Sequence, residues 1–286
     1  MRLATILTDQ GPRACGEFEG HYVDINHADP RLPSTVREIL ALGPEGVRAV
    51  AEALPRGGRK HAPTHPGILA PVPHPAKIVC LGLNYRDHAA ESGMDVPSEP
   101  ILFSKYATAL IGPGAPIVLP EASREVDYEA ELVVVVGRGG RDIPADRAMD
   151  HVGGYAVGND VSARDWQLGK PGKQWMAGKT FDTFAPVGPV VVTPDEVPDP
   201  HNLPIRLKLN GQVMQDSNTD QLIFRVDYVI AYLSRIFTLE PGDLIFTGTP
   251  PGVGMARKPP AWLKDGDSVE VSIEGLGTLT NPVVRR

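Results

Sequence analysis

The chain has 286 residues and a formal net charge of −7, so it lacks the basic patch with which proteins follow a phosphate backbone. Its 29 prolines and 30 glycines favour strands and turns over long helices. No apolar run approaches the roughly 18 residues that span a bilayer, and the start has no signal-peptide core. Cys15 and Cys80 lack zinc-site spacing, and we expect two reduced thiols. These features predict a soluble cytoplasmic protein without nucleic-acid or membrane partners.

Residues 1–70 are predicted to form a small N-terminal α/β domain. Two strand-like pieces open it, and two short helices follow at residues 34–42, with Ser34 as the N-cap, and at residues 44–54. Residues 55–77 are dense in Pro, Gly and His, a composition typical of a connector. We therefore expect a domain boundary near residue 70.

Residues 71–286 are predicted to form the main domain, in which strand patterns prevail. The strands come in runs rather than alternating with helices, which excludes a doubly wound α/β domain. Asn210 and Gly211 provide the two positive-φ positions of a tight hairpin turn. One long amphipathic helix is expected over residues 222–237. The predicted fold class is α+β, mainly β.

Three acidic residues alternate with apolar residues in VDYEAELVVVVG, residues 126–137. In a strand, Asp127, Glu129 and Glu131 would point to one face. That face is either solvated or, because like charges repel one another unless they are screened, a cation site. Asp160 ends another strand-like stretch, from which its carboxylate can reach the same point. Three such oxygen donors suit Mg²⁺ or Mn²⁺ and leave positions open for a substrate.

A second candidate group is His88 and Glu91 within GLNYRDHAAESG, residues 82–93. On a helical turn the two side chains share a face, and a carboxylate that orients an imidazole and raises its pKa makes a general base. The alternative is an incidental pair on a surface helix. Arg164 and Lys179 are cations among apolar neighbours, where each either forms a structural salt bridge or holds a substrate carboxylate.

Signatures of other enzyme classes are absent or imperfect. GKQWMAGKT, residues 172–180, has one residue too many between its glycines for a phosphate-binding loop, and no apolar strand precedes it. The sequence contains neither the G-x-S-x-G elbow of serine hydrolases nor the H-E-x-x-H motif of zinc peptidases.

Residues 70–286 resemble the fumarylacetoacetate hydrolase family. The resemblance rests on motifs that occur here in the family's order: LGLNYRDHAAE, PILFSK, VDYEAELVVVVG, GGYAVGNDVSARDWQ, GKTFDTFAPVGP, LNGQVMQDSNT and DLIFTGTPPGVG. It implies a mixed β-sandwich roll with one Mg²⁺ or Mn²⁺, in a homodimer. The segment before residue 70 resembles that of bacterial members from aromatic and sugar-acid catabolism, and the minimal acylpyruvases lack it. The resemblance as a whole is to a bacterial member similar to acylpyruvases and fumarylpyruvate hydrolases.

The resemblance also implies roles for single residues. The positions that match the metal ligands are Glu129, Glu131 and Asp160. His88 and Glu91 match a water-activating dyad on a lid segment, and Lys179 matches a lysine that stabilises the developing anion. The positions that match substrate contacts are Arg164, Gln167 and Thr249. Asp127 matches none of the usual ligands and has no assigned role.

The implied reaction is hydrolysis of a C–C bond in a 1,3-diketo (acylpyruvate-type) or related 2-oxo acid through a metal-bound enolate. The metal would act as a Lewis acid on the carboxylate and keto oxygens, and His88 would activate the attacking water. Two reactions on the same site stay open: oxaloacetate-type decarboxylation and 2-hydroxyhepta-2,4-diene-1,7-dioate isomerisation. A non-catalytic member that only binds a 2-oxo acid stays open as well.

Overall fold

The computed structural model describes residues 1–285, and one large sheet runs through it. Its strand order is β4-β3-β2-β1-β14-β12-β11-β17-β6-β7, with β5 on β1 and β8 on β14. The bounds of these strands are β1 (Arg2–Thr8), β2 (Gly11–Phe18), β3 (His21–Asp24), β4 (Lys60–His61), β5 (Ile68–Leu69), β6 (Ile78–Gly82), β7 (Ile101–Lys105), β8 (Leu110–Ile111), β11 (Ala130–Val136), β12 (Val152–Asn159), β14 (Ala185–Val192) and β17 (Leu244–Phe246).

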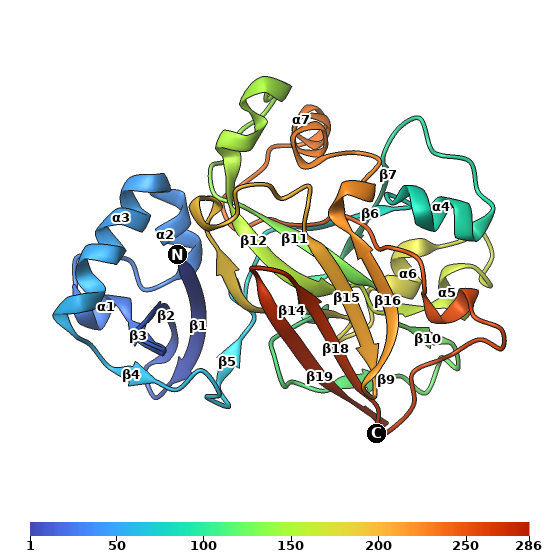
Figure 1. Ribbon diagram of the computed structural model, residues 1–286, viewed down its shortest axis with the longest axis horizontal. Coiled ribbons are helices and arrows are strands. Elements are labelled where there is room, and N and C mark those ends of the chain that lie inside the picture. The colour runs from blue at the N-terminus through green and yellow to red at the C-terminus, as the bar shows by residue number, and fades with distance from the viewer. Residues whose placement is uncertain (286) are drawn as a thin grey trace.

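A five-stranded sheet packs against the centre of the large sheet and makes a sandwich (Figure 1). In spatial order its strands are β16 (Gln212–Asn218), β15 (Pro204–Leu209), β18 (Ser268–Ile273), β19 (Gly277–Arg285) and β9 (Ile117–Leu119). A two-stranded ribbon pairs β10 (Val126–Asp127) with β13 (Ser162–Ala163). The predicted class, α+β and mainly β, is confirmed.

Short helices pack around these sheets (Figure 1). They are α1 (Ile25–Ala28), α2 (Val36–Ala41), α3 (Gly43–Ala53), α4 (Arg86–Ser92), α5 (Arg164–Gln167), α6 (Trp175–Lys179) and α7 (Val226–Ile236). Of these, α2 and α3 cover one face of the N-terminal part of the large sheet (Figure 1). The 3-10 turns are η1 (Leu54–Arg56), η2 (Ala107–Ala109), η3 (Ala145–His151), η4 (Pro194–Glu196), η5 (Thr219–Gln221) and η6 (Gly254–Ala256). Among residues 1–285, none of the helices has both the length and the apolar character needed to cross a membrane.

Strand β11 is buried on both faces, which explains its run of valines. Leu132 and Val134 face the core shared with the five-stranded sheet. Val133 and Val135 face a second core, to which Leu40 of α2 and Leu3 of β1 contribute. A strand covered on both sides is continuously apolar rather than alternating. The entrance of this strand is therefore a rigid support for any side chains placed there.

The N-terminal part joins the main part through backbone hydrogen bonds. β1 pairs antiparallel with β14, so the large sheet extends across the proposed boundary. The predicted connector contributes β4 and β5 to this sheet, which its composition did not indicate. The division of the chain at residue 70 stays a prediction.

Two predicted helix boundaries are wrong. The N-cap of α2 is Thr35 rather than Ser34: its hydroxyl accepts from the Glu38 N–H at 3.2 Å. Ser34 lies outside the helix, where its carbonyl accepts from the Ala14 N–H.

The helix expected over residues 222–237 begins only at Val226. Asn84 holds the preceding segment outside the helix, because its backbone carbonyl and its side chain bond the backbone of Ile223 and Phe224. The predicted hairpin is confirmed, with φ of 52° at Asn210 and 81° at Gly211. Cys15 and Cys80 are free and buried, as expected.

Candidate metal centre

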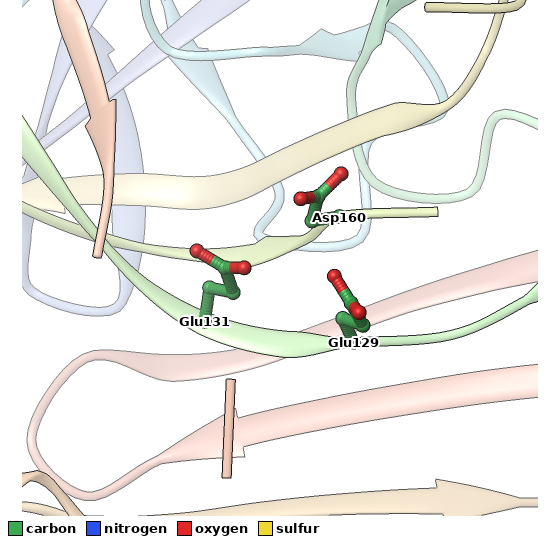
Figure 2. A group of neighbouring side chains, drawn as sticks. All are labelled: Glu129, Glu131 and Asp160. Atoms are coloured by element: carbon green, nitrogen blue, oxygen red, sulfur yellow. The ribbon is translucent and has the colours of Figure 1, made fainter. Parts of the chain in front are cut away.

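Three carboxylates meet where β11 begins and β12 ends (Figure 2). β11 and β12 are antiparallel, so the start of one lies beside the end of the other, with Ala130 opposite Asn159. Glu129 and Glu131 flank the first residue of β11, and Asp160 follows β12. One oxygen from each lies within 4.8 Å of the others, and all three side chains are buried. The predicted trio is thus brought together.

Asp127 is not part of this trio, because the predicted single strand is interrupted. β10 ends at Asp127 and β11 begins at Ala130. Between them the Glu129 N–H donates to the side-chain oxygen of Asn159 in β12 at 2.9 Å instead of to a backbone carbonyl. The predicted strand is therefore interrupted, although Asp127 and Glu129 both contact Nη2 of Arg164 and their carboxylates thus lie close together.

Two cations pair with Glu129. Arg164 Nη2 lies 2.7 Å from Glu129 Oε1, and Lys179 Nζ contacts Glu129 Oε2. Lys179 also donates to Asp160 Oδ2 at 2.9 Å. Burial by itself would raise the pKa of Glu129, but Arg164 and Lys179 outweigh burial and lower the pKa to about 2. Glu129 is therefore ionised at neutral pH.

Glu131 has a different environment. Its Oε2 accepts from the Gly248 N–H at 2.7 Å. Burial, followed by the negative charges of Asp160 and Glu129, raises the pKa of Glu131 well above its ordinary value. A buried carboxyl group that faces two other carboxylates must either keep its proton or have its negative charge balanced by a cation bound between the three groups.

Lys105 is a buried cation of this centre that the sequence did not indicate. Its Nζ donates to the backbone carbonyls of Val161, Lys179 and Phe184. The ammonium has three N–H groups, all used by these bonds. Although Nζ is 2.7 Å from Asp160 Oδ1, that oxygen accepts no hydrogen bond within residues 1–285. Lys105 thus neutralises charge while the lone pairs of Oδ1 remain available to a ligand.

The donor set fits a hard divalent cation. All three groups offer carboxylate oxygen, and neither thiolate nor imidazole is among them. Together with the neighbouring Asp127, four carboxylates face the cations Lys105, Arg164 and Lys179. The cluster therefore carries one excess negative charge when all groups are ionised. A divalent cation would turn this into one excess positive charge, which favours an anionic substrate.

The predicted His88–Glu91 pair is formed on α4. His88 Nδ1 lies 3.1 Å from Glu91 Oε2, and the side chains are 13% and 27% exposed. The other oxygen of Glu91 accepts from the Gly252 N–H at 2.9 Å. The imidazole therefore has a carboxylate that orients it, and the carboxylate is itself fixed by backbone.

One loop, residues 247–255, connects this dyad to the acidic trio. It follows β17, and its N–H groups bond Glu131 through Gly248 and Glu91 through Gly252. Thr249 lies between them and accepts from Gln215 Nε2 at 2.9 Å. Because a single short loop bonds both groups, their relative position is fixed. The loop overlaps the motif DLIFTGTPPGVG and contains Thr249, both of which the sequence indicated. Backbone N–H donors leave no motif of charged residues, however, so the bonds to Glu131 and Glu91 were not predicted.

The predicted substrate contacts lie in the same region. Gln167 Oε1 accepts from Arg164 Nη1 at 2.9 Å, and both side chains are buried. Gln215, absent from the sequence predictions, ties the Ala130 N–H to Thr249 and Pro250. The roles of these residues in binding and catalysis stay predictions.

Asp127 holds two parts of the centre in place through hydrogen bonds. Its oxygens accept from Arg164 Nε at 2.9 Å and from the N–H groups of Gly254 at 2.7 Å and Met255 at 3.0 Å. It thus fixes both the end of the loop at residues 247–255 and the arginine that pairs with Glu129.

Replacing Asp127 with Ala is expected to destabilise the protein by about 3–5 kcal/mol, because it leaves the buried Arg164 short of a partner. Urea unfolding measures this loss. Asp216→Ala, which breaks the exposed Arg206–Asp216 pair, is the matched control and should cost no more than about 1 kcal/mol. Equal losses in the two variants would contradict the anchoring role.

Comparisons with known proteins place this site in a family. Residues 77–284 match the family model described as fumarylacetoacetate (FAA) hydrolase C-terminal. An oxaloacetate tautomerase of Bos taurus, named as mitochondrial, is 52% identical over 269 residues, which cover 93% of this chain and 84% of the relative. The solved structure of fumarylacetoacetate hydrolase from Exiguobacterium antarcticum has a TM-score of 0.85 at 36% identity and covers 100% of both chains. That of 5-carboxymethyl-2-hydroxymuconate delta-isomerase from Mycobacterium smegmatis has a TM-score of 0.78 at 37% identity and covers 100% of this chain and 99% of its own.

These relatives correct the expected localisation. The similar tautomerases of Xenopus laevis, Bos taurus and Homo sapiens are all named as mitochondrial proteins. The expectation of a cytoplasmic protein, which rested on composition and on the lack of an apolar signal core, is therefore wrong. Neither feature distinguishes the cytoplasm from an organelle interior.

The similar proteins include a hydrolase and an isomerase whose solved structures share this fold, and tautomerases that are similar in sequence. Since the family model covers well over half of the residues and those proteins align over nearly the whole chain, the protein belongs to the fumarylacetoacetate hydrolase family of enzymes.

Proposed function

We propose that the protein is a divalent-metal-dependent tautomerase that interconverts the enol and keto forms of oxaloacetate or a closely related 2-oxo acid. One observation carries the proposal: the His88–Glu91 acid–base pair and the acidic trio are bonded to the same loop. The name of the Bos taurus relative, at 52% identity, supports oxaloacetate as the substrate.

Glu129, Glu131 and Asp160 would hold the metal, as Mg²⁺ or Mn²⁺. The bound metal would act as a Lewis acid towards the substrate's C1 carboxylate and C2 oxygen. Lys179, between Glu129 and Asp160, provides positive charge beside the same position. A fixed cation there favours the negative charge that develops on the C2 oxygen over the neutral ground state.

The dyad moves the proton at carbon. Ketonisation of an enol delivers one proton to C3 and releases one proton from the C2 hydroxyl, so the overall charge is unchanged. His88 would deliver the C3 proton, with Glu91 stabilising the imidazolium, and the hydroxyl proton would leave to water. The reverse direction uses the same groups in the opposite protonation states.

C–C bond hydrolysis of an acylpyruvate is the second candidate. The observation in its favour is the partial exposure of His88 and Glu91, which lets water reach the imidazole for activation. Decarboxylation does not require an activated water, and no other feature of the described site favours it. A homodimer also stays a prediction.

The experiment that tests the proposal uses metal-stripped protein with and without added Mg²⁺ or Mn²⁺. Freshly dissolved oxaloacetate, acetylpyruvate and fumarylpyruvate serve as substrates, and enol absorbance and pyruvate release are followed separately. We expect metal-dependent loss of the oxaloacetate enol without pyruvate release. Pyruvate release from the acylpyruvates, with no effect on the oxaloacetate enol, would overturn the proposal in favour of hydrolysis. If the protein changes neither the enol absorbance nor the pyruvate release with any of the three substrates, it would be a protein that only binds a 2-oxo acid.

A further inference from the structure

Arg257 is a partly buried cation whose partners within residues 1–285 are neutral. Its Nε donates to the carbonyl of Gly252 at 3.3 Å, and its Nη2 donates to the carbonyl of Met214. None of the ion pairs in this part of the chain includes it. A guanidinium that is partly withdrawn from water gains most from a carboxylate. Its charge is therefore available to an external anion.

Gly252 places this guanidinium beside the dyad. The Gly252 N–H holds Glu91, and its carbonyl accepts both from Arg257 and from the Tyr128 hydroxyl at 3.3 Å. Its φ is +100°, and a Cβ there would lie 2.1 Å from the carbonyl oxygen of Met214. The residue must therefore be glycine, and its position is fixed. Because Tyr128 donates to the same carbonyl, Gly252 stays held when Arg257 turns to a substrate.

The other cations near the site are already engaged. Lys105, Arg164 and Lys179 each contact carboxylates of the metal centre. Arg86, on the dyad's helix α4, is exposed and donates to the carbonyl of Leu222, so water solvates its charge. Arg257 therefore differs from these cations. It is partly desolvated and lies next to the dyad, and no carboxylate within residues 1–285 balances its charge.

We propose that Arg257 binds the second carboxylate of a 2-oxo dicarboxylate substrate. The inference rests on the proposed function and deepens it. In oxaloacetate the C4 carboxylate is bonded to C3, the carbon that exchanges a proton with His88. A group that binds this carboxylate must therefore lie beside the dyad, where Arg257 is. In acetylpyruvate an uncharged acetyl group occupies that position, so Arg257 selects dicarboxylates against acylpyruvates whose acyl group is uncharged.

The test compares two inert ligands, malate and lactate, on the Mg²⁺-loaded full-length protein. Both offer a carboxylate and a 2-hydroxyl, but only malate has a second carboxylate. Calorimetric titration should show that malate binds at least about tenfold more tightly than lactate. Arg257→Met should remove this preference by weakening malate alone, and Arg257→Lys should retain part of it. Arg206→Met, which alters an exposed arginine of the β15–β16 hairpin, should bind both ligands as the wild type does.

Three results would overturn the inference: no malate preference in the wild type, an undiminished preference in Arg257→Met, or an equal weakening of both ligands. The last would mean that Arg257 only supports the loop at residues 247–255. If Arg257→Met does not fold, as judged by its thermal melt, Arg257→Lys decides by the same comparison. The titrations measure binding without turnover, so they test the role of Arg257 alone. The tautomerase proposal is tested separately by the enol-conversion assay.

Discussion

Glu131→Gln is expected to abolish metal binding while making the metal-free protein more stable. The amide oxygen can still accept from the Gly248 N–H, so the loop at residues 247–255 keeps its bond. The substitution removes a buried carboxyl that faces Asp160 and Glu129, and with it the cost of keeping that group protonated or ionised. Loss of one of three ligands should weaken metal binding by at least about 100-fold and bring turnover to background.

Thermal melts with and without Mg²⁺ test both parts of this expectation. A ligand that binds only the folded state raises the melting temperature, so wild-type protein should respond to Mg²⁺ and Glu131→Gln should not. Glu270→Gln, at a partly exposed carboxylate that pairs with Lys208 far from the trio in the sequence, is the control and should respond like the wild type. An unchanged Mg²⁺ response in Glu131→Gln would refute the ligand assignment.

The stability difference between the two metal-free proteins should grow as pH rises. The pKa of Glu131 is raised in the folded state, so below its ordinary pKa both folded and unfolded chains are protonated there and nothing is lost. Above that value the unfolded chain releases the proton and the folded chain retains it, so the free energy of unfolding falls with pH. Glu131→Gln has no such group. Melts of both proteins between about pH 5 and about pH 8 measure the difference, and a constant gap would contradict this account.

His88→Ala is expected to lower the rate of enol–keto conversion about 10²- to 10⁴-fold, the usual contribution of a positioned general acid–base. Metal binding should persist, because His88 bonds Glu91 and none of the trio. The measurement is kcat on oxaloacetate together with the Mg²⁺-induced shift in melting temperature. If the shift disappears along with activity, His88 supports the centre rather than transferring protons. Glu91→Gln, which removes the charge that stabilises the imidazolium, should have a smaller effect in the same direction.

The members of the trio could be predicted from the sequence because both the residue type, carboxylate, and the alternate spacing indicated a cation site. Acidic residues at alternate positions before a run of valines are rare in a buried strand unless a cation balances them, and the burial of Glu129 and Glu131 contradicts the alternative of a solvated face. The pattern did not reveal the break in the strand between residues 127 and 130, nor that Asp127 pairs with Arg164.

The groups that the sequence did not reveal act through backbone or through long-range contacts. Lys105 ends a strand, and only the folded chain brings its ammonium to three carbonyls far along the sequence. Gly248 and Gly252 contribute N–H groups, which every residue except proline possesses. Arg257 lies in a proline-rich loop without periodicity. The contacts of these residues form only in the folded chain and leave no periodic or charged motif in the sequence.

The most direct test of the central claim is a Mg²⁺ titration of metal-stripped protein in which the ketonisation rate of oxaloacetate enol and the melting temperature are followed together. The account predicts a rate at the uncatalysed background without metal and a saturable rise with Mg²⁺, parallel to the rise in melting temperature. A full rate in metal-stripped protein, or a melting temperature that rises while the rate stays at background, would contradict it.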